Sequence, residues 1–136
     1  MDVLKIQPEK LPMAERSTLW TVTDPRGLDV SLADDVWQEH VAYRPELAAY
    51  LAAVALTVQD PDAIYFDPAT TAHRTTGARI YLYYRSGLTK GKYADTYIAV
   101  VIKVLPHNDH AEHGYVESAM LSNRIMRRAV LEWKRE

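Results

Sequence analysis

Three segments in the second half of the chain constrain its fold most strongly. Arg79–Arg85 and Tyr97–Leu105 are rich in β-branched and aromatic residues, and residues 115–121 continue in the same way. Runs of this composition are typical of β-strands. Short polar connections containing glycine separate the three segments. Because consecutive strands joined in this way pair with their sequence neighbours, the sequence predicts an antiparallel meander.

Two further strands are expected earlier in the chain. Thr18–Thr23 alternates β-branched and other residues and ends at the turn-forming residues 24–27. Ala63–Phe66 is a short apolar run that ends at Asp67 and Pro68. Turn-forming residues at the end of a short apolar run usually mark the end of a strand.

Helices are expected between these two strands. Ser31 followed by Asp34 resembles a capping box, which predicts that a first helix begins there and runs toward Pro45. A second helix is predicted over residues 46–58, where large apolar side chains recur at helical spacing: Leu47, Tyr50, Leu51, Val54 and Val58. Helices followed by strands indicate an α+β domain with the helices on one face of a twisted antiparallel sheet.

In the last segment, residues 122–136, the apolar residues fall on one side of a predicted helix and the basic residues fall elsewhere. Ile125, Met126, Ala129 and Trp133 alternate with arginines and lysines. This spacing predicts a C-terminal amphipathic helix. With 136 residues the chain has room for one domain, in which residues 1–16 form a polar leader.

Composition excludes several classes of protein. Sixteen Lys and Arg against eighteen Asp and Glu leave a net charge of -2, so no overall basic field attracts nucleic acid or anionic membrane. The absence of cysteine excludes a disulfide framework, a thiolate nucleophile and a Cys-based zinc site. Residues 1–16 lack the apolar core of a signal peptide, and no run of about 18 apolar residues occurs. We therefore expect a cytoplasmic protein without a membrane partner or a cofactor.

The leading candidate for a catalytic site combines one histidine with three cationic residues. His40 and Arg44 are four residues apart on one predicted helical face, and Arg85 and Lys103 come from predicted strands. Cleavage of RNA without a metal needs a group that takes the 2′-hydroxyl proton, a group that protonates the leaving oxygen, and cations that stabilise the phosphorane. Together with the hydroxyl of Ser118 these residues supply those parts. The alternative is that His40 is a partly buried helix residue and Arg44 a solvated charge.

Two further sets of residues are candidates for binding nucleic acid. Arg124 and Arg128 fall on related turns of the predicted C-terminal helix and would meet a phosphate backbone, although a soluble helix has the same appearance. Tyr81 and Tyr83 share one face of a predicted strand, where they could stack bases or pack in the core.

A metal site is the third alternative. His107, His110 and His113 recur at three-residue intervals beside two carboxylates. Imidazole is a zinc ligand, but a dedicated site needs a rigid frame, and this segment is predicted to be a polar loop between strands. No dinucleotide-binding, P-loop, zincin or nucleophile-elbow motif occurs.

The order of several short motifs resembles one nuclease superfamily. A helical His40 precedes Pro45-Glu46, followed by Asp60-Pro61-Asp62, Tyr83-Tyr84-Arg85, Lys103 within an apolar strand, and Ser118-Ala119 in a final strand. This order resembles the BECR superfamily, named for the barnase, EndoU, colicin and RelE nucleases, and in particular its phage-associated members. The resemblance covers residues 31–121, which would form the nuclease-like core.

The resemblance implies a fold and an activity. The expected fold is two N-terminal helices packed on a four-stranded antiparallel sheet, and the expected activity is metal-independent cleavage of RNA in toxin or phage systems. His40 would be the acid or base, Arg44 and Arg85 phosphate-facing cations, Lys103 a sheet cation and Ser118 the hydroxyl of the final strand. The implied partners are RNA and an antitoxin or phage protein. The alternative is a non-catalytic binding or assembly module with the same fold, and the residues leave the oligomeric state open.

Overall fold

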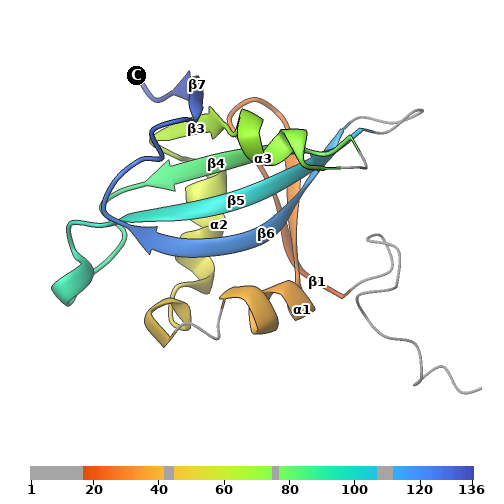
Figure 1. Ribbon diagram of the computed structural model, residues 1–136. Helices are drawn as coiled ribbons and strands as arrows, with labels where there is room; N and C mark the ends of the chain where they lie inside the picture. Colours follow the sequence, from red (N-terminus) through yellow and green to blue (C-terminus); the bar gives the residue numbers. More distant parts are fainter. Residues whose placement is uncertain (1–16, 42–44, 75–76, 107–111) are drawn as a thin grey trace, which may run out of the picture.

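A mixed β-sheet forms the centre of the computed structural model, which describes residues 17–41, 45–74, 77–106 and 112–136. Within these residues the sheet has seven strands in the order β1-β2-β6-β5-β4-β3-β7 (Figure 1). The strands are β1 (Thr18–Thr23), β2 (Asp29–Ala33), β3 (Ala63–Phe66), β4 (Arg79–Arg85), β5 (Tyr97–Leu105), β6 (His113–Ser122) and β7 (Val130–Lys134).

The middle of the sheet contains the three-stranded antiparallel meander that the sequence predicts, formed by β4, β5 and β6, and β3 extends it beside β4. β3, β4, β5 and β6 pair successively in antiparallel fashion. The β1–β2 hairpin joins this meander through a short parallel pairing of β2 with β6. β7 pairs antiparallel with β3 and forms the opposite edge of the sheet.

Gly114 permits the parallel pairing of β2 with β6. Gly114 lies opposite Val30 of β2 and Val104 of β5. A Cβ atom at Gly114 would lie 3.1 Å from the Cγ2 atoms of both Ile102 and Val30, and 3.3 Å from Cδ2 of Leu28. Only glycine therefore fits between these side chains without displacing them.

Short helices connect the strands. α1 (Asp34–Val36) continues into a π-helical turn, η4 (Trp37–Val41), and a 3₁₀ turn, η5 (Pro45–Leu47), precedes α2 (Leu51–Gln59). α3 (Pro68–Ala72) follows β3, and a second 3₁₀ turn, η6 (Gly91–Tyr93), lies between β4 and β5. α2 lies behind β4 and β5, whereas α3 lies in front of the sheet (Figure 1). No helix in the described part of the chain is long and apolar enough to cross a membrane.

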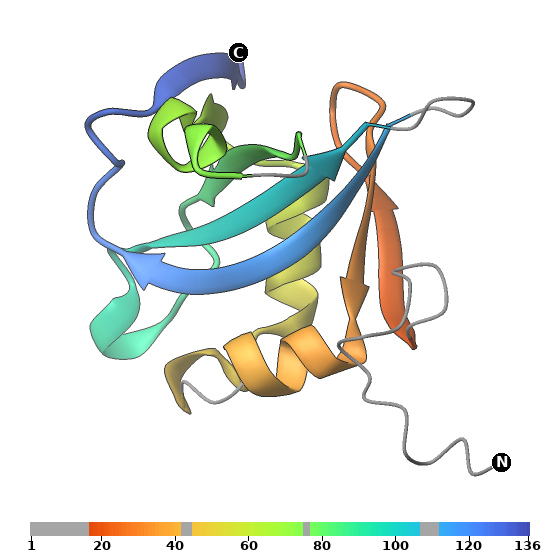
Figure 2. The same ribbon diagram turned by 45° about the vertical axis from the view of Figure 1, so that its right-hand side comes forward.

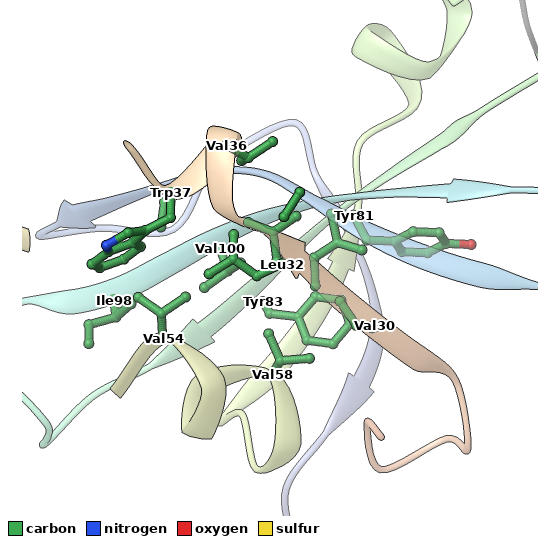
Figure 3. Close-up of a cluster of buried hydrophobic side chains, with 14 of the residues drawn as sticks. Val30, Leu32, Val36, Trp37, Val54, Val58, Tyr81, Tyr83, Ile98 and Val100 are labelled. Atoms are coloured by element: carbon green, nitrogen blue, oxygen red, sulfur yellow. The ribbon is translucent and has the colours of Figure 1, made fainter. Parts of the chain in front are cut away.

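The main core fills the side of the sheet on which α1 and α2 pack, here called the helix-covered face. Val54 and Val58 of α2 and Trp37 of η4 pack there against side chains that project from the strands (Figure 3). The fully buried strand residues of this core are Val30, Leu32, Ile64, Tyr83, Ile98, Val100, Ile102 and Ala119. Because strand side chains alternate between the two faces, this packing also determines which residues face the other side.

The opposite side, here called the open face, has a smaller apolar cluster. Leu82, Tyr84 and Ala99 are buried there, and Ile125 and Met126 cover them. The last two residues belong to the loop of residues 123–129, which leads from β6 to β7. The loop and α3 bury the open-face residues of β4, whereas residues of β5 and β6 on this face, such as Val101, Lys103 and Met120, stay partly exposed.

The structure corrects the predicted architecture in two respects. The sheet has seven strands where the family resemblance implied four, and residues 122–136 form a loop and the strand β7 where a C-terminal amphipathic helix was expected. The apolar residues of this segment are used differently: Ile125 and Met126 cover the open face, and Trp133 lies opposite Ile64 of β3. Pairing with the edge of β3 satisfies the backbone of this segment, and this tertiary contact overrides its helical period.

The helix predicted to begin at Ser31 is a further correction. Ser31 lies inside β2, and the helix begins at Asp34. The Ser31 hydroxyl does not cap a helix but lies 2.8 Å from Oγ1 of Thr21 and 2.8 Å from Nε2 of His113. The second helix is also shorter than predicted, because the chain forms η5 and a turn before α2 begins at Leu51.

Candidate functional site

A β-bulge in β6 places two polar side chains on the open face. Val101 of β5 pairs with Ser118, and Ile102 pairs with Val116, so Glu117 is an extra residue on β6. Val116 and Ala119 are buried on the helix-covered face. Glu117 and Ser118 between them are therefore both directed toward the open face, which regular alternation would not allow.

Lys103 lies beside the bulge on the same face. It pairs with Tyr115 of β6 and with Ile80 of β4, and it is two residues along β5 from Val101, the partner of Ser118. Lys103 and Ser118 are therefore diagonal neighbours, which lie about 7–8 Å apart in an antiparallel pair. Tyr115 is half-buried, and burial raises the pKa of its phenol, which stays protonated at neutral pH.

Arg74 reaches this site from the other side of the open face. Its Nη2 donates a hydrogen bond to Oε2 of Glu117 at 2.8 Å, and both side chains are partly exposed. α3 positions Arg74: the Asp67 carboxylate accepts from the backbone N–H and the hydroxyl of Thr70, and Arg74 N–H donates to the carbonyl of Thr71. Arg74, Lys103, Tyr115, Glu117 and Ser118 are hereafter called the bulge site.

A groove of about 620 Å³ adjoins the bulge site on the open face. Its floor includes Leu82, Ala99, Val101 and Met120, and Arg124 and Arg127 of the loop of residues 123–129 contribute to its walls. Val101 pairs with Ser118, and Met120 follows Ser118 by two residues on β6. The groove and the bulge site are therefore neighbouring parts of one surface.

His40 lies in η4, near the outer edge of β6. β2 pairs only with residues 113–115 of β6, and beyond that point α1 and η4 pack alongside β6 (Figures 1 and 2). His40 is exposed to solvent. The predicted partner of His40, Arg44, lies outside the described residues.

Arg85 is the predicted cation that the structure separates from Lys103. Arg85 pairs with Ile98 on the helix-covered face, whereas Lys103 pairs with Ile80 on the open face. Arg85 is five positions after Ile80 on β4, a distance of about 17 Å along a strand. One substrate phosphate therefore cannot contact both side chains.

The Arg85 side chain instead takes part in an ion-pair cluster at the end of α2. Its Nη1 donates to Oδ2 of Asp60 at 2.9 Å, and its Nε lies 3.9 Å from Oδ1 of Asp62. Arg135, which follows β7, lies 3.1 Å and 3.5 Å from the same two carboxylates. These contacts connect the C-terminal segment to the β3–β4 region.

Tyr83 is buried in the main core. Its side chain is fully inaccessible to solvent, and its hydroxyl donates to Oδ2 of Asp24 at 2.5 Å. Burial, followed by the hydrogen bond to the Asp24 carboxylate, raises the pKa of Tyr83 strongly. In this position the ring has no exposed face on which a nucleobase could stack.

The basic residues of the C-terminal segment have a different grouping from the one that the helical spacing predicts. Arg124 contributes to the groove, as does Arg127. Arg128 is exposed in the same loop and is not among the described residues that line the groove. Because the helix does not form, the relation of Arg124 to Arg128 across one turn is lost.

One of the three candidate metal-binding histidines is described by the structure. His113 begins β6, and its Nε2 lies 2.8 Å from the Ser31 hydroxyl, while its ring lies 4.8 Å from the ring of Tyr115. His107 and His110 fall outside the described residues. The part of the chain that the structure describes contains no group of three or more His, Asp or Glu side chains arranged to hold a metal ion.

Glu117, Arg74 and Arg127 are site residues that the sequence reasoning did not select. Glu117 and Arg74 are 43 residues apart, and nothing in their local sequence indicates that they meet.

No family model, curated protein or solved structure matched the chain in the three comparisons with known proteins. The candidate site is therefore defined by its own geometry.

Proposed function

We propose that the chain is a metal-independent ribonuclease and that the bulge site is its catalytic centre. The observation that carries this proposal is the contact of the Glu117 carboxylate with Arg74 on the open face, beside Lys103. A carboxylate that accepts a proton, next to two cations that neutralise a phosphate, meets the main requirements for RNA cleavage. α1 and α2 pack on the opposite face of the sheet, and α3 and the loop of residues 123–129 cover only part of this surface, so that Lys103, Glu117 and Ser118 remain partly exposed to an extended strand.

The reaction assigns a role to each group. Glu117 takes the proton of the 2′-hydroxyl, and the 2′-oxygen then forms a bond to phosphorus while the bond from phosphorus to the 5′-oxygen breaks. Lys103 and Arg74 stabilise the charge on the phosphorane, and the hydroxyls of Ser118 and Tyr115 orient its oxygens. His40 lies outside the bulge site, in the turn η4 that packs beside β6 at the edge of the sheet, and it is assigned as the acid that protonates the leaving 5′-oxygen of the bound RNA. The products are a 2′,3′-cyclic phosphate and a 5′-hydroxyl.

A non-catalytic binding or assembly module is the second candidate function. It is favoured by the edge strand β7, on which Val130 and Leu131 are 52% and 50% exposed. An exposed apolar edge strand can pair with a strand of another protein, such as an antitoxin, a phage protein or a second copy of the chain. In this case the bulge site would contribute to binding without cleaving RNA.

Cleavage of a mixed-sequence RNA in EDTA tests the proposed function. We expect the wild-type chain to cleave, Glu117→Gln to lower the rate by about 10² or more, and His40→Ala to lower it comparably. Glu132→Gln, in the exposed part of β7, is the matched control because it makes the same change of charge away from the site. Circular dichroism and thermal unfolding verify equal folding.

Two results would contradict the proposal. One is a rate for Glu117→Gln equal to that of Glu132→Gln. The other is cleavage that EDTA abolishes and a divalent metal restores. Absence of cleavage by the folded wild-type chain at high concentration would instead favour the binding module.

A further inference from the structure

The groove on the open face combines an apolar floor with polar groups at its depth. Leu82, Ala99, Val101 and Met120 line the floor. Tyr84 lies among them with its ring almost fully buried, and its oxygen accepts a hydrogen bond from the backbone N–H of Met126 at 3.2 Å. Burial raises the pKa of this phenol, so it stays protonated and has a hydrogen to donate.

Two arginines give the groove a positive charge. Arg124 and Arg127 contribute to its walls from the loop of residues 123–129. Both residues are exposed to solvent, and neither forms an ion pair with a carboxylate in the described part of the chain. A planar guanidinium matches the oxygens of a phosphate, which makes an anionic ligand the chemical complement of this part of the groove.

The volume and the lining suit one nucleotide. Pockets for small ligands have volumes of about 300–1,000 Å³ and apolar walls with a few polar groups, and the groove of about 620 Å³ falls in this range. A nucleobase has two apolar faces and a polar edge, so it buries its faces against aliphatic and aromatic side chains while its edge accepts or donates hydrogen bonds. The Tyr84 hydroxyl and the Asp67 carboxylate, which also lines the groove, offer a donor and an acceptor.

The groove begins next to the proposed catalytic centre. Met120, in the groove, is two residues along β6 from Ser118, which corresponds to about 7 Å. One sugar–phosphate unit spans this distance. A nucleotide adjacent to the scissile phosphate can therefore enter the groove while that phosphate lies at Lys103 and Arg74.

We infer that the groove is a base-binding subsite for single-stranded RNA, with one nucleobase on its apolar floor and a neighbouring phosphate on Arg124 and Arg127. The inference deepens the proposed function and rests on it. It makes single-stranded RNA the substrate class, because a base that is paired and stacked in a duplex is not free to enter the groove. A second copy of the chain is the other candidate occupant of an apolar groove on this face.

Equilibrium binding of an uncleavable oligonucleotide to the full chain tests the inference. The probe is a fluorescein-labelled 2′-O-methyl RNA of six nucleotides and mixed sequence, which lacks the 2′-hydroxyl that the proposed reaction requires. Fluorescence anisotropy compares the wild type with the double variant Arg124→Ala/Arg127→Ala. The matched control is Arg128→Ala, which removes an arginine from the same loop outside the groove lining.

We expect the double variant to bind at least ten times more weakly, and Arg128→Ala to remain within about twofold of wild type. A six-residue abasic oligomer with the same number of phosphates should bind wild type at least ten times more weakly than the probe, because it has no base for the floor. Val101→Phe, which fills the groove next to Ser118, should weaken binding of the probe by a similar factor. The arginine comparison remains decisive if that variant does not fold.

Three results would overturn the inference. The first is that Arg128→Ala weakens binding of the probe as much, for each charge removed, as the double variant does. The second is equal affinity for the abasic oligomer and the probe. The third is a concentration-dependent dimer in light scattering that the double variant abolishes, with no binding of the probe, which would identify a second copy as the occupant.

The inference and the proposed function fail in different ways. Binding of the probe in the groove without cleavage of ordinary RNA would contradict the nuclease and leave the subsite in place. Cleavage that depends on Glu117, with probe binding that is unaffected by the double variant, would contradict the subsite and support the nuclease.

Discussion

The two faces of the central sheet are built from the same strands but have different roles. On the helix-covered face, α1 and α2 bury a continuous set of aliphatic and aromatic side chains. On the open face, a smaller apolar cluster adjoins Lys103, Glu117 and Ser118. Neighbouring residues of one strand therefore belong to a structural core and to a candidate site. This difference shows that the register of each strand, more than its composition, decides which residues are available for chemistry.

The largest expected effect on stability is that of Ile102→Ala. It is compared with Lys103→Ala, because Ile102 and Lys103 are neighbours on β5 that face opposite sides of the sheet. Ile102 is fully buried in the main core, so Ile102→Ala should lower the free energy of unfolding by about 2–5 kcal/mol. Lys103→Ala on the open face should change it by about 0.5 kcal/mol or less. Urea unfolding measures both. Similar losses for the two variants would contradict the assignment of the faces.

Gly114→Ala tests the close packing on the helix-covered face. The added Cβ would lie 3.1 Å from methyl groups of Ile102 and Val30, both of which are fully buried and have little room to move. Overpacking of this kind costs about 1–3 kcal/mol, which thermal or urea unfolding would detect. Unchanged stability would mean that the junction of β2 with β6 is less tightly packed than described.

The pH dependence of stability distinguishes the buried phenol of Tyr83 from exposed tyrosines. Because the folded-state pKa of Tyr83 is raised, its phenol ionises in the unfolded chain above pH ~10 while it stays neutral in the folded chain. The unfolded state then binds fewer protons, so stability falls as pH rises, by about 1.4 kcal/mol per pH unit for this group. Unfolding between pH 8 and 11 should show a shallower decline for Tyr83→Phe than for wild type. Identical slopes would argue against the buried, neutral phenol.

The smallest expected effect is at the ion-pair cluster beside the helix-covered face. Arg135 contacts Asp60 and Asp62, all of which are partly exposed. Arg135→Ala should therefore cost about 0–1 kcal/mol, and the difference from wild type should shrink in 1 M salt. A larger loss that salt does not reduce would show that the cluster contributes more to the attachment of β7 than exposed ion pairs usually do.

The strands of the meander could be predicted from the sequence because their composition and their contacts agree. β4 and β5 have the predicted bounds, since β-branched and aromatic residues in both are buried in the sheet. β2 was missed because Ser31 and Asp34 match a capping box, whereas the Ser31 hydroxyl bonds to Thr21 and His113. β7 could not be predicted because the apolar residues of this segment recur at helical spacing. The sequence does not show that β3 has a free edge with which the segment can pair.

The candidate site was harder to predict because it depends on strand register and distant contacts. Lys103 and Ser118 could be selected from the sequence as a cation and a hydroxyl in neighbouring strands. The bulge that turns Glu117 to the same face has no local signal, and Arg74 meets Glu117 only through the packing of α3. The separation of Arg85 from Lys103 follows from the pairing of β4 with β5, which composition does not reveal.

The most direct test of the account compares the two sheet cations that the sequence suggested, Lys103 and Arg85. RNA cleavage in EDTA is measured for Lys103→Ala and Arg85→Ala at matched folding. If the open face is the active one, Lys103→Ala lowers the rate by about 10² or more, whereas Arg85→Ala remains within a few fold of wild type. Loss of cleavage in Arg85→Ala, with Lys103→Ala unaffected, would place the chemistry away from the bulge site and contradict the account.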